Sequence, residues 1–377
     1  METITKLEVR IGSDKIGDLA LYKNRLAAFA YTPEWIRKGF SISPFQLPLK
    51  SGVFIPKYDP FDGLFGIFAD SLPDGWGRLL VDRMLLREKV DPLSVGSLNR
   101  LAIVGSSGMG ALSYFPSHQW KSKTGKKDFD LLAEECRKIL VSERPDDLDF
   151  LFQMGGSSGG ARPKILIQLD GEDWIVKFPS SSDPADIGRM EYDYSVTAAK
   201  CGIEMPKTAL FPSRKGSGYF GTLRFDRTLL PTGEIKRIHM ASVSALLEIS
   251  HRIPALDYHS LMALTWQLTK DYQELEKMYR LMCFNVFSHN RDDHSKNFSF
   301  LYDQERWRLS PAYDLTYSNS IGGEHATTVH GNGRNPGMED VLCVASEIGI
   351  GSRKARKIAK DVRDCVKEHL DFGQENP

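Results

Sequence analysis

The chain of 377 residues is 41% hydrophobic, which is enough to bury a large core and predicts two or three folded units. Its 49 basic and 49 acidic residues cancel, so no global field favours nucleic acid or an anionic membrane, and contact with DNA would need a local patch or a partner. The five cysteines include no C-x-x-C pair, which disfavours zinc and a disulfide framework and suits a reducing cytoplasm. The N-terminus lacks a long apolar run and no apolar stretch reaches about 18 residues, so we predict neither export nor membrane insertion.

The N-terminal part of the chain predicts a small domain that begins with strands. Apolar and polar residues alternate over residues 6–30, with predicted breaks at Gly12–Asp14 and near Gly17–Asp18. A Pro-Asp-Gly turn then precedes apolar residues at helical spacing, which predicts a helix over residues 76–87. The basic, polar segment Trp120–Lys127 is the predicted junction to the rest of the chain.

The next region predicts a hairpin followed by a helix. Residues 165–178 alternate between apolar and polar on both sides of Asp170-Gly171, which predicts an antiparallel pair of strands ending near Lys177. Apolar residues at helical spacing then predict a helix from Gly188 to Gly202, with Glu191 in its first turn.

Helical patterns dominate from about residue 240 onward. Leu275, Met278, Met282 and Val286 have the spacing of one helix face, and the helix is expected to end near Ser288. The polar segment that follows would therefore be held by a rigid element.

That polar segment contains an aspartate and an asparagine separated by four residues, Asp292 and Asn297, and Asp314 follows downstream. In a protein-kinase catalytic loop, an aspartate accepts the proton of the substrate hydroxyl and an asparagine five positions later holds magnesium. A second aspartate, in a later loop, binds the metal that bridges the phosphates. An isolated pair of this kind is also typical of a polar turn after a helix, so other residues must decide between the two interpretations.

Lys177 and Glu191 favour the kinase interpretation through their order in the chain. A kinase places a phosphate-binding lysine on a strand and a glutamate that orients it on the next helix. Lysine, glutamate, base, metal asparagine and metal aspartate occur here in the order that a kinase requires.

A glycine-rich segment, Gly155–Lys164, precedes the lysine strand where a kinase phosphate loop should lie. Its glycines Gly159 and Gly160 would let backbone amides approach phosphate. It is not a Walker A loop, because Ala161 follows Gly160, and a flexible linker has a similar composition. A second cluster, Gly105–Gly110, predicts a tight turn.

Three histidines lie near the predicted catalytic residues, and the sequence does not assign a catalytic or metal-binding role to them. His294 lies in the predicted catalytic loop, but no partner carboxylate can be assigned to it from the sequence. His325 and His330 lie close together in a glycine-rich stretch and do not match a recognised metal-ligand spacing.

Taken together, the motifs resemble those of the HipA-type serine/threonine kinases, the toxin components of bacterial type II toxin–antitoxin modules. The resemblance covers nearly the whole chain, and the segments that carry it are Phe61–Phe65, Ser71–Arg78, Gly108–Leu112, Gly159–Lys164, Arg224–Arg227, Asp292–Ser299 and Pro311–Asp314.

The resemblance implies roles for individual residues that agree with the kinase interpretation. It makes Lys177 the phosphate-binding lysine, Asp292 the base, and Asn297 and Asp314 the magnesium ligands. It adds that the backbone of Leu223 to Phe225 would hold adenine and that Asp226 would lie beside the nucleotide.

The resemblance also implies regulation. Family members can phosphorylate a serine of their own phosphate loop, which ejects the loop and stops the enzyme; Ser157 aligns with that serine and Ser158 is adjacent. At the position after the catalytic aspartate this chain has Asp293, and a carboxylate beside the base is expected to affect metal occupancy or the pKa of the base.

The predicted fold is therefore α+β, with a small α/β N-terminal subdomain over residues 1–115 and a bilobal kinase-like body over residues 116–377. The N-lobe would reach about residue 225, and a mainly helical C-lobe would occupy residues 226–377. The predicted activity is ATP- and Mg²⁺-dependent phosphorylation of a host protein, for which the resemblance implies an aminoacyl-tRNA synthetase or another translation component. It also implies a small DNA-binding, HipB-like antitoxin as partner, with DNA bound only through the antitoxin.

Two alternatives remain open at this stage. One is a small-molecule kinase, because related folds share the same spacing of aspartate and asparagine. The other is a catalytically weak protein that binds an antitoxin.

Overall fold

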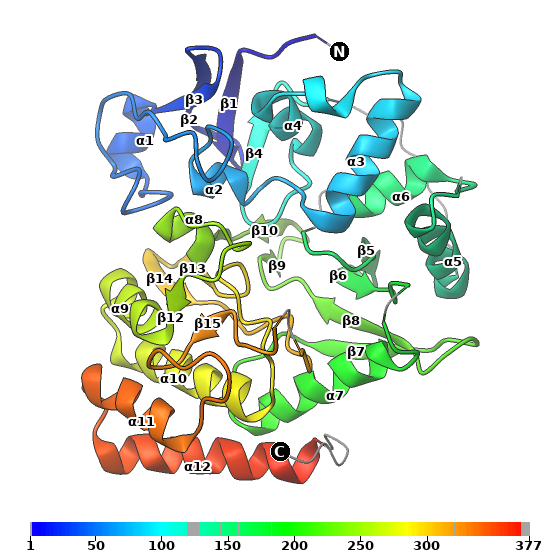
Figure 1. Cartoon of the computed structure of the whole chain (residues 1–377). Coiled ribbons are helices and arrows are strands. Elements are labelled where there is room, and N and C mark those ends of the chain that lie inside the picture. The colour runs from blue at the N-terminus through cyan, green and yellow to red at the C-terminus, as the bar shows by residue number, and fades with distance from the viewer. Residues whose placement is uncertain are drawn as a thin grey trace. The chain divides into compact units, whose positions relative to one another are not determined.

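The computed structural model describes residues 2–118, 128–143, 145–156, 159–181, 183–319 and 322–370. The chain divides into two compact units. Figure 1 colours the chain by residue number, from blue at the N-terminus to red at the C-terminus. The first unit comprises Met1–Gly188, Leu210–Ala241 and Ala245–Glu248, and the second comprises Arg189–Ala209, Ser242–Ser244 and Ile249–Pro377. Neither unit is one continuous segment, and the domain boundaries near residues 115 and 225 remain predictions.

The first unit begins with an antiparallel sheet of order β3-β2-β1-β4. Its strands are β1 (Lys6–Ile11), β2 (Asp14–Tyr22), β3 (Leu26–Tyr31) and β4 (Leu112–Phe115). The strands predicted over residues 6–30 are confirmed, but the break predicted near Gly17 is wrong. β2 continues there because Gly17 has no side chain and the Phe29 ring packs against its backbone; a Cβ atom would lie 2.4 Å from that ring. The chain reverses instead at Lys23 and Asn24, whose φ angles are 49° and 57°.

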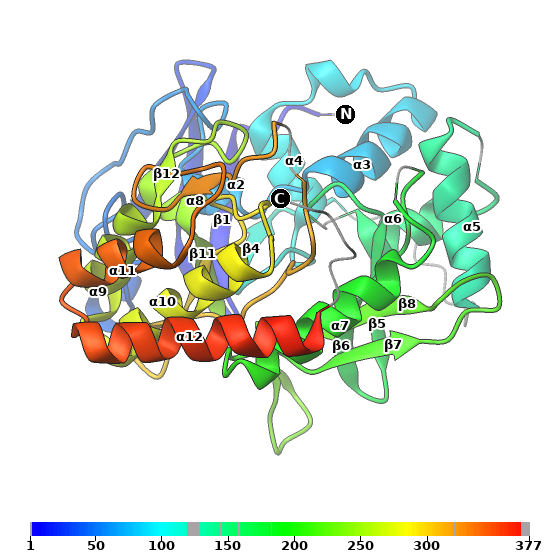
Figure 2. The same ribbon diagram turned by 60° about the horizontal axis from the view of Figure 1, so that its bottom comes forward.

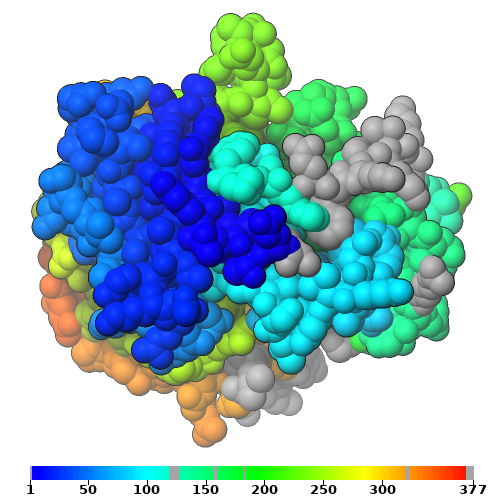
Figure 3. Space-filling model, turned by 90° about the horizontal axis from the view of Figure 1, so that it is seen from above, coloured from blue at the N-terminus to red at the C-terminus, as the bar shows by residue number. Residues whose placement is uncertain are grey.

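Helices surround this sheet and extend beyond it within the first unit. They are α1 (Pro33–Lys38), α2 (Gly66–Ala69), α3 (Gly75–Arg87), the 3₁₀-helix η1 (Pro92–Ser94), α4 (Ser97–Val104), α5 (Phe129–Leu140) and α6 (Leu148–Gly155). The predicted helix over residues 76–87 is confirmed as α3. Figure 3 shows the dark blue N-terminal sheet and the cyan segment of α3 and α4 side by side on one face of this unit.

A second sheet, of order β5-β6-β8-β7, carries the predicted lysine strand. Its strands are β5 (Lys164–Leu169), β6 (Glu172–Lys177), β8 (Tyr219–Leu223) and β7 (Thr208–Phe211), of which β7 begins in the second unit. The predicted hairpin is confirmed, with Ile165 opposite Val176 across β5 and β6. Trp76 of α3 packs into the same core and donates its indole N–H to the carbonyl oxygen of Lys164, at 3.0 Å. A ribbon of β9 (Arg227–Leu229) and β10 (Ile235–Arg237) follows.

The second unit is mainly helical, and Figure 2 shows α12 lying along its other helices. Its helices are α7 (Ile187–Lys200, which begins in the first unit), α9 (Tyr258–Thr269), α10 (Tyr272–Phe287), α11 (Met338–Glu347) and α12 (Ser352–His369). Its strands are β12 (Leu256–Asp257), β13 (Ser299–Asp303), β14 (Arg306–Leu309) and β15 (Thr327–Thr328). The short elements β11 (His239–Ser242) and α8 (Val243–Leu247) cross between the two units.

Two helices predicted from the sequence are confirmed in this unit. The helix predicted between Gly188 and Gly202 is α7, and the helix predicted to end near Ser288 is α10, with Ser288 as its C-terminal cap. α10 contacts both α9 and α12, so the polar segment after it is attached to the core of the unit. Among the described residues, every helix is too short or too polar to cross a bilayer.

The hydrogen bond between Trp76 and Lys164 predicts a specific effect on stability. Because the indole N–H is buried, Trp76→Phe would leave the carbonyl oxygen of Lys164 without this donor, at a cost of about 1–3 kcal/mol. We expect a clearly lower Tm by circular dichroism. Trp266→Phe is the control, because that ring is 45% exposed and its loss should change stability by about 0.5 kcal/mol or less. Equal shifts in the two variants would contradict this assignment.

Candidate functional site

The segment after α10 forms a compact loop closed by its own asparagine. The side-chain amide of Asn297 donates to the carbonyl oxygen of Asp292 at 2.7 Å, and its backbone N–H donates to the carbonyl oxygen of His294 at 2.8 Å. The Asp292 side chain is 58% exposed, and one of its carboxylate oxygens lies 3.8 Å from Nε2 of His294. The spacing of four intervening residues thus holds Asp292 at the surface with Asn297 beside it.

A chain of buried side-chain hydrogen bonds attaches this loop to two helices. Asn290 donates to Asn285 of α10 at 2.9 Å, and Asn285 donates to the hydroxyl of Tyr258, at the start of α9, also at 2.9 Å. That hydroxyl donates in turn to the carboxylate of Asp293, at 2.9 Å. All four side chains are nearly fully buried, so the chain of bonds constrains the loop strongly.

Asp293 is the centre of these contacts. Its side chain has almost no exposed surface; one oxygen accepts from Tyr258 and lies 2.9 Å from Nδ1 of His325, and the other accepts from the backbone N–H of Thr327 at 3.1 Å. The hydroxyl of Thr327 also donates to the carbonyl oxygen of Asp293, at 2.5 Å. Burial, and then the adjacent Asp293 carboxylate, raise the pKa of Tyr258 well above its usual value.

The structure shows how Asp293 lies, while its effect on metal occupancy or on the pKa of the base stays a prediction. The Asp293 carboxylate faces the interior and its oxygens are engaged by Tyr258, His325 and Thr327. It is therefore a structural anchor of the loop and not a second exposed carboxylate beside Asp292.

The segment Pro311–Asp314 is attached to the same loop by a tyrosine. The hydroxyl of Tyr313 donates to the carbonyl oxygen of Lys296 at 2.7 Å and shares a hydrogen bond of 2.5 Å with the hydroxyl of Ser299. Asp314 follows with a φ of 53°, a left-handed conformation that aspartate tolerates better than most residues. The second unit thus brings the predicted base and both predicted metal ligands onto connected segments.

Glu191 also belongs to the second unit, on α7, and is buried. The remaining predicted residues lie in the first unit. Lys177 ends β6 opposite Lys164, and its ammonium is 5.5 Å from the centroid of the Phe220 ring, within the range of a cation–π interaction.

The described end of the glycine-rich segment is held by the start of α3. The carboxylate of Asp74 accepts from the backbone N–H of Gly160, and the carbonyl oxygen of Gly160 accepts from the N–H of Trp76 at 3.0 Å. Gly160 has a φ of 83°, which favours glycine, and Gly159 precedes it. Ser157 and Ser158 lie outside the described residues.

Asp226 is fully buried in a cluster of arginines. Its carboxylate accepts from Arg224 at 3.0 and 2.8 Å, from Arg227 at 2.7 Å and from the backbone N–H of Gly110 at 2.6 Å. Burial alone would raise its pKa, but the charge and hydrogen bonds of Arg224, and then the charge of Arg227, hold the pKa below its usual value. Asp226 therefore anchors the predicted turn at Gly108–Gly110, and its place beside the nucleotide stays a prediction.

The predicted adenine-binding residues flank this cluster. Leu223 ends β8 opposite Trp174, and Phe225 is half-buried between Arg224 and Asp226.

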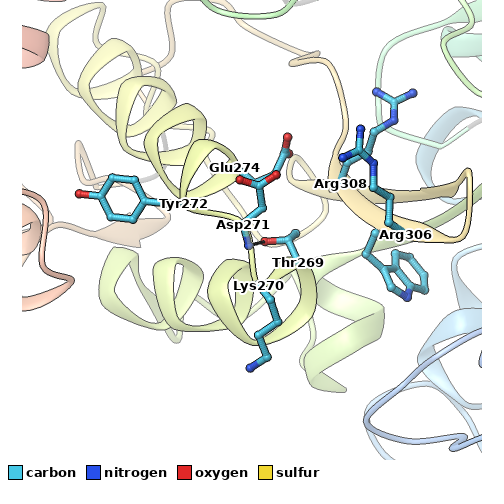
Figure 4. Close-up of a pocket in the computed structure, with 8 residues that line it drawn as sticks. Thr269, Lys270, Asp271, Tyr272, Glu274, Arg306 and Arg308 are labelled. Carbon is cyan, nitrogen blue, oxygen red and sulfur yellow. Dashed lines mark hydrogen bonds between the residues drawn. The ribbon is translucent and has the colours of Figure 1, made fainter.

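A separate pocket of about 280 Å³ opens in the second unit where α9 meets α10 and β14 (Figure 4). The residues that line it are Thr269, Lys270, Asp271, Tyr272, Glu274, Arg306, Trp307 and Arg308. Glu274 is engaged elsewhere, because its carboxylate accepts from the backbone N–H of Leu309 at 2.6 Å and from Lys277 at 2.9 Å. None of the lining residues belongs to the predicted kinase constellation.

Comparison with known families accounts for both halves of the chain. The model of the HipA N-terminal domain matches residues 7–115, and the model of the HipA-like C-terminal domain matches residues 156–370, more than half of the chain. The chain belongs to the HipA family. Two relatives from Sinorhizobium fredii (strain NBRC 101917 / NGR234), Y4dM and Y4mE, carry the word kinase in their names.

Y4dM is 25% identical over 341 residues, which cover 84% of this chain and 78% of Y4dM, and Y4mE is 24% identical over 343 residues, which cover 83% and 77%. A HipA from Shewanella oneidensis MR-1, solved in a complex of HipA, HipB and operator DNA, has a TM-score of 0.69 and 17% identity; the match covers 98% of this chain and 92% of that one. The HipA-family protein described here therefore has a mixed α/β HipA fold and is kinase-like.

Sequence reasoning missed the residues that anchor the site of this HipA-family protein. Tyr258 and Thr327 supply contacts described above but lie outside the segments that carry the resemblance. Tyr313 lies in one of those segments, Pro311–Asp314, but the motif assigns it no role. His325 was visible as a histidine in a glycine-rich stretch, but its partner Asp293 is 32 residues away.

Substitution of the two adjacent aspartates should affect stability to very different degrees. Asp293→Ala would leave the Tyr258 hydroxyl and the Thr327 N–H without their buried acceptor, at about 1–3 kcal/mol for each, and should lower the Tm by several degrees. Asp292→Ala removes an exposed carboxylate and should shift stability by about 0.5 kcal/mol or less. Asp293→Asn, which keeps one acceptor, should fall between them. Thermal unfolding of the three variants checks this order, and a Tm for Asp293→Ala equal to that of Asp292→Ala would contradict it.

Proposed function

We propose that this HipA-family chain is a serine/threonine protein kinase that uses ATP and Mg²⁺. The observation that supports it is the connection between the Asp292–Asn297 loop and the Asp314 segment through the hydrogen bonds of Tyr313. Asp292 is the base in this proposal, since its carboxylate is exposed and its backbone is fixed by Asn297 and by the buried Asp293.

The two proposed metal ligands fit magnesium by their chemistry. The amide nitrogen of Asn297 is used for the bond to Asp292, so its amide oxygen is the atom that would face a cation. Together with the carboxylate of Asp314 it offers hard oxygen donors, which Mg²⁺ prefers. When bound, Mg²⁺ would neutralise the charge on the transferred phosphate.

The phosphate and adenine contacts would come from the first unit. In this proposal Lys177 binds the phosphates and Glu191 orients it, while Gly159 and Gly160 approach the phosphates through their backbone. The backbone of Leu223 to Phe225 contacts adenine. The bonds of Gly160 to Asp74 and Trp76 hold the backbone at Gly160 without involving a side chain of its own.

We further propose that the chain acts on a serine or threonine of a host protein and binds a small DNA-binding antitoxin. The solved HipA with the same fold was crystallised with HipB and operator DNA, which supports the choice of partner class. A translation component, such as an aminoacyl-tRNA synthetase, is the substrate class that the sequence resemblance implies.

The first test of this function is Asp292→Asn. Loss of the base should lower phosphotransfer by about 10²–10⁴-fold while the Tm stays close to that of the wild type. Labelled ATP is added to a host-cell lysate with wild type or variant, and phosphate on proteins is compared with phosphate on metabolites. Label on metabolites alone would favour a small-molecule kinase. ATP binding without any transfer would favour a protein that only binds the antitoxin.

Asp314→Asn should reproduce the loss of phosphotransfer and raise the Mg²⁺ concentration needed for half-maximal rate.

The second test concerns Ser157 and, next to it, Ser158, which we propose as autophosphorylation sites that switch the kinase off. A phosphate adds about −1.5 to −2 charges to a loop that would otherwise accept the phosphates of ATP, so ATP affinity should fall. Mass spectrometry after incubation with ATP and Mg²⁺ should find phosphate on this pair in the wild type and none in Asp292→Asn. A phosphorylated form that binds ATP as tightly as the unmodified protein would overturn this mechanism and leave the kinase proposal standing.

A further inference from the structure

Two histidines and a glutamate from three separate elements of the second unit converge on one point. His259 lies in the first turn of α9, His330 follows β15, and Glu347 ends α11. Their ligand atoms all lie within 4.8 Å of one another. None of these three residues takes part in the proposed kinase chemistry, and a site made of them is independent of that function.

The arrangement of His259 is that of a metal ligand. Its Nδ1 lies 2.8 Å from a carboxylate oxygen of Asp257, which fixes the ring and directs Nε2 toward Glu347. Nε2 is buried and makes no hydrogen bond of acceptable geometry, although a Glu347 oxygen lies only 2.7 Å away. Metal-bound histidines usually donate their other ring N–H to a carboxylate in this way.

The carboxylate of Asp257 is itself fixed. It caps the N-terminus of α9 and accepts from the hydroxyl of Thr328 at 2.6 Å and from the backbone N–H of Gly331 at 2.9 Å. The second of these bonds also holds the turn that carries His330, whose φ is 53°. One carboxylate therefore positions both histidines.

The three ligand atoms are close enough together to share one ion. Zinc binds nitrogen and oxygen at about 2.0–2.1 Å, so two ligand atoms at the tetrahedral angle lie about 3.3 Å apart. One carboxylate oxygen of Glu347 lies 2.7 Å from Nε2 of His259, the other lies 3.7 Å from Nδ1 of His330, and the three ligand atoms lie within 4.8 Å of one another. The ligand atoms have room to move toward the tetrahedral separation, because the His330 and Glu347 side chains are 45% and 55% exposed.

The position of Glu347 adds an electrostatic argument. Glu347 is the last residue of α11, where the helix dipole disfavours a negative charge. A dication bound there would be stabilised by both the carboxylate and the helix terminus.

We propose that His259, His330 and Glu347 bind one divalent metal ion of the zinc class, with Asp257 orienting the first histidine. Two imidazoles and a carboxylate suit Zn²⁺, whereas Mg²⁺ prefers oxygen ligands, so this site is chemically distinct from the proposed magnesium site. The ion would join the start of α9, the turn after β15 and the end of α11. It lies next to the parallel pair of β12 and β15, whose residue Thr327 holds Asp293. Binding should therefore stabilise the second unit.

The test measures metal binding to the full chain after removal of metals with a chelator. Zinc sulfate is titrated in competition with a chromophoric chelator, and we expect one Zn²⁺ per chain and a rise in Tm that the chelator reverses. His259→Ala, Glu347→Gln and His330→Asn should each weaken binding at least about tenfold, and Asp257→Asn about 10–100-fold. Asparagine is chosen at position 330 because it tolerates the positive φ.

The matched control is His118→Ala, which removes an exposed histidine of the first unit and should leave zinc binding unchanged. Zinc binding in the double variant His259→Ala/His330→Asn that equals the wild type, or no bound zinc in the wild type, would overturn the proposal. Glu347→Gln at an exposed helix end keeps the test informative if the histidine variants unfold. Because the readouts are binding and Tm, failure here is separable from failure of the kinase proposal.

Discussion

The buried carboxylate of Asp293 holds together the part of the second unit on which the proposed chemistry depends. It receives donors from α9, from β15 and from the stretch before β15, so the loop after α10 is fixed to three other segments at once. A buried carboxylate is costly unless its oxygens are hydrogen-bonded, and here every contact that offsets the cost also fixes the loop. Asp292, the next residue back, projects to the surface because Asp293 is turned inward.

The first unit also contains a buried carboxylate that fixes nearby backbone. Asp226 is buried among Arg224 and Arg227 and holds the backbone of Gly110, which joins the N-terminal sheet region to the ribbon after β8. Removing one partner from such a cluster leaves an uncompensated buried charge, which is strongly destabilising. In both units, a buried carboxylate thus fixes the backbone of a loop or turn through its hydrogen bonds.

The proposed metal site extends the network around Asp293. The parallel pair of β12 and β15 places Asp257 opposite Thr328, and the preceding residue Thr327 contacts Asp293. His259, which Asp257 orients, and the loop that carries Asp292 are therefore both attached to the short strand pair β12 and β15.

The sequence by itself determined the local elements of the fold. Alternation predicted the hairpin of β5 and β6, and helical spacing predicted α3, α7 and α10, because these features depend on neighbours in the chain. The family was also visible, since its motifs are contiguous. The continuation of β2 through Gly17 was not, because it depends on the Phe29 ring of the next strand.

Only the tertiary structure decided which of the charged residues are exposed and what they contact. Asp292 and Asp293 are the same type of residue and adjacent in the sequence. Asp292 is nevertheless exposed, whereas Asp293 is buried and contacts His325, 32 residues later. His330 found its partners in His259 and Glu347 and not in the nearby His325. The physical reason is that burial and ligand geometry arise from side chains that meet only when distant segments pack, and no local pattern records those meetings.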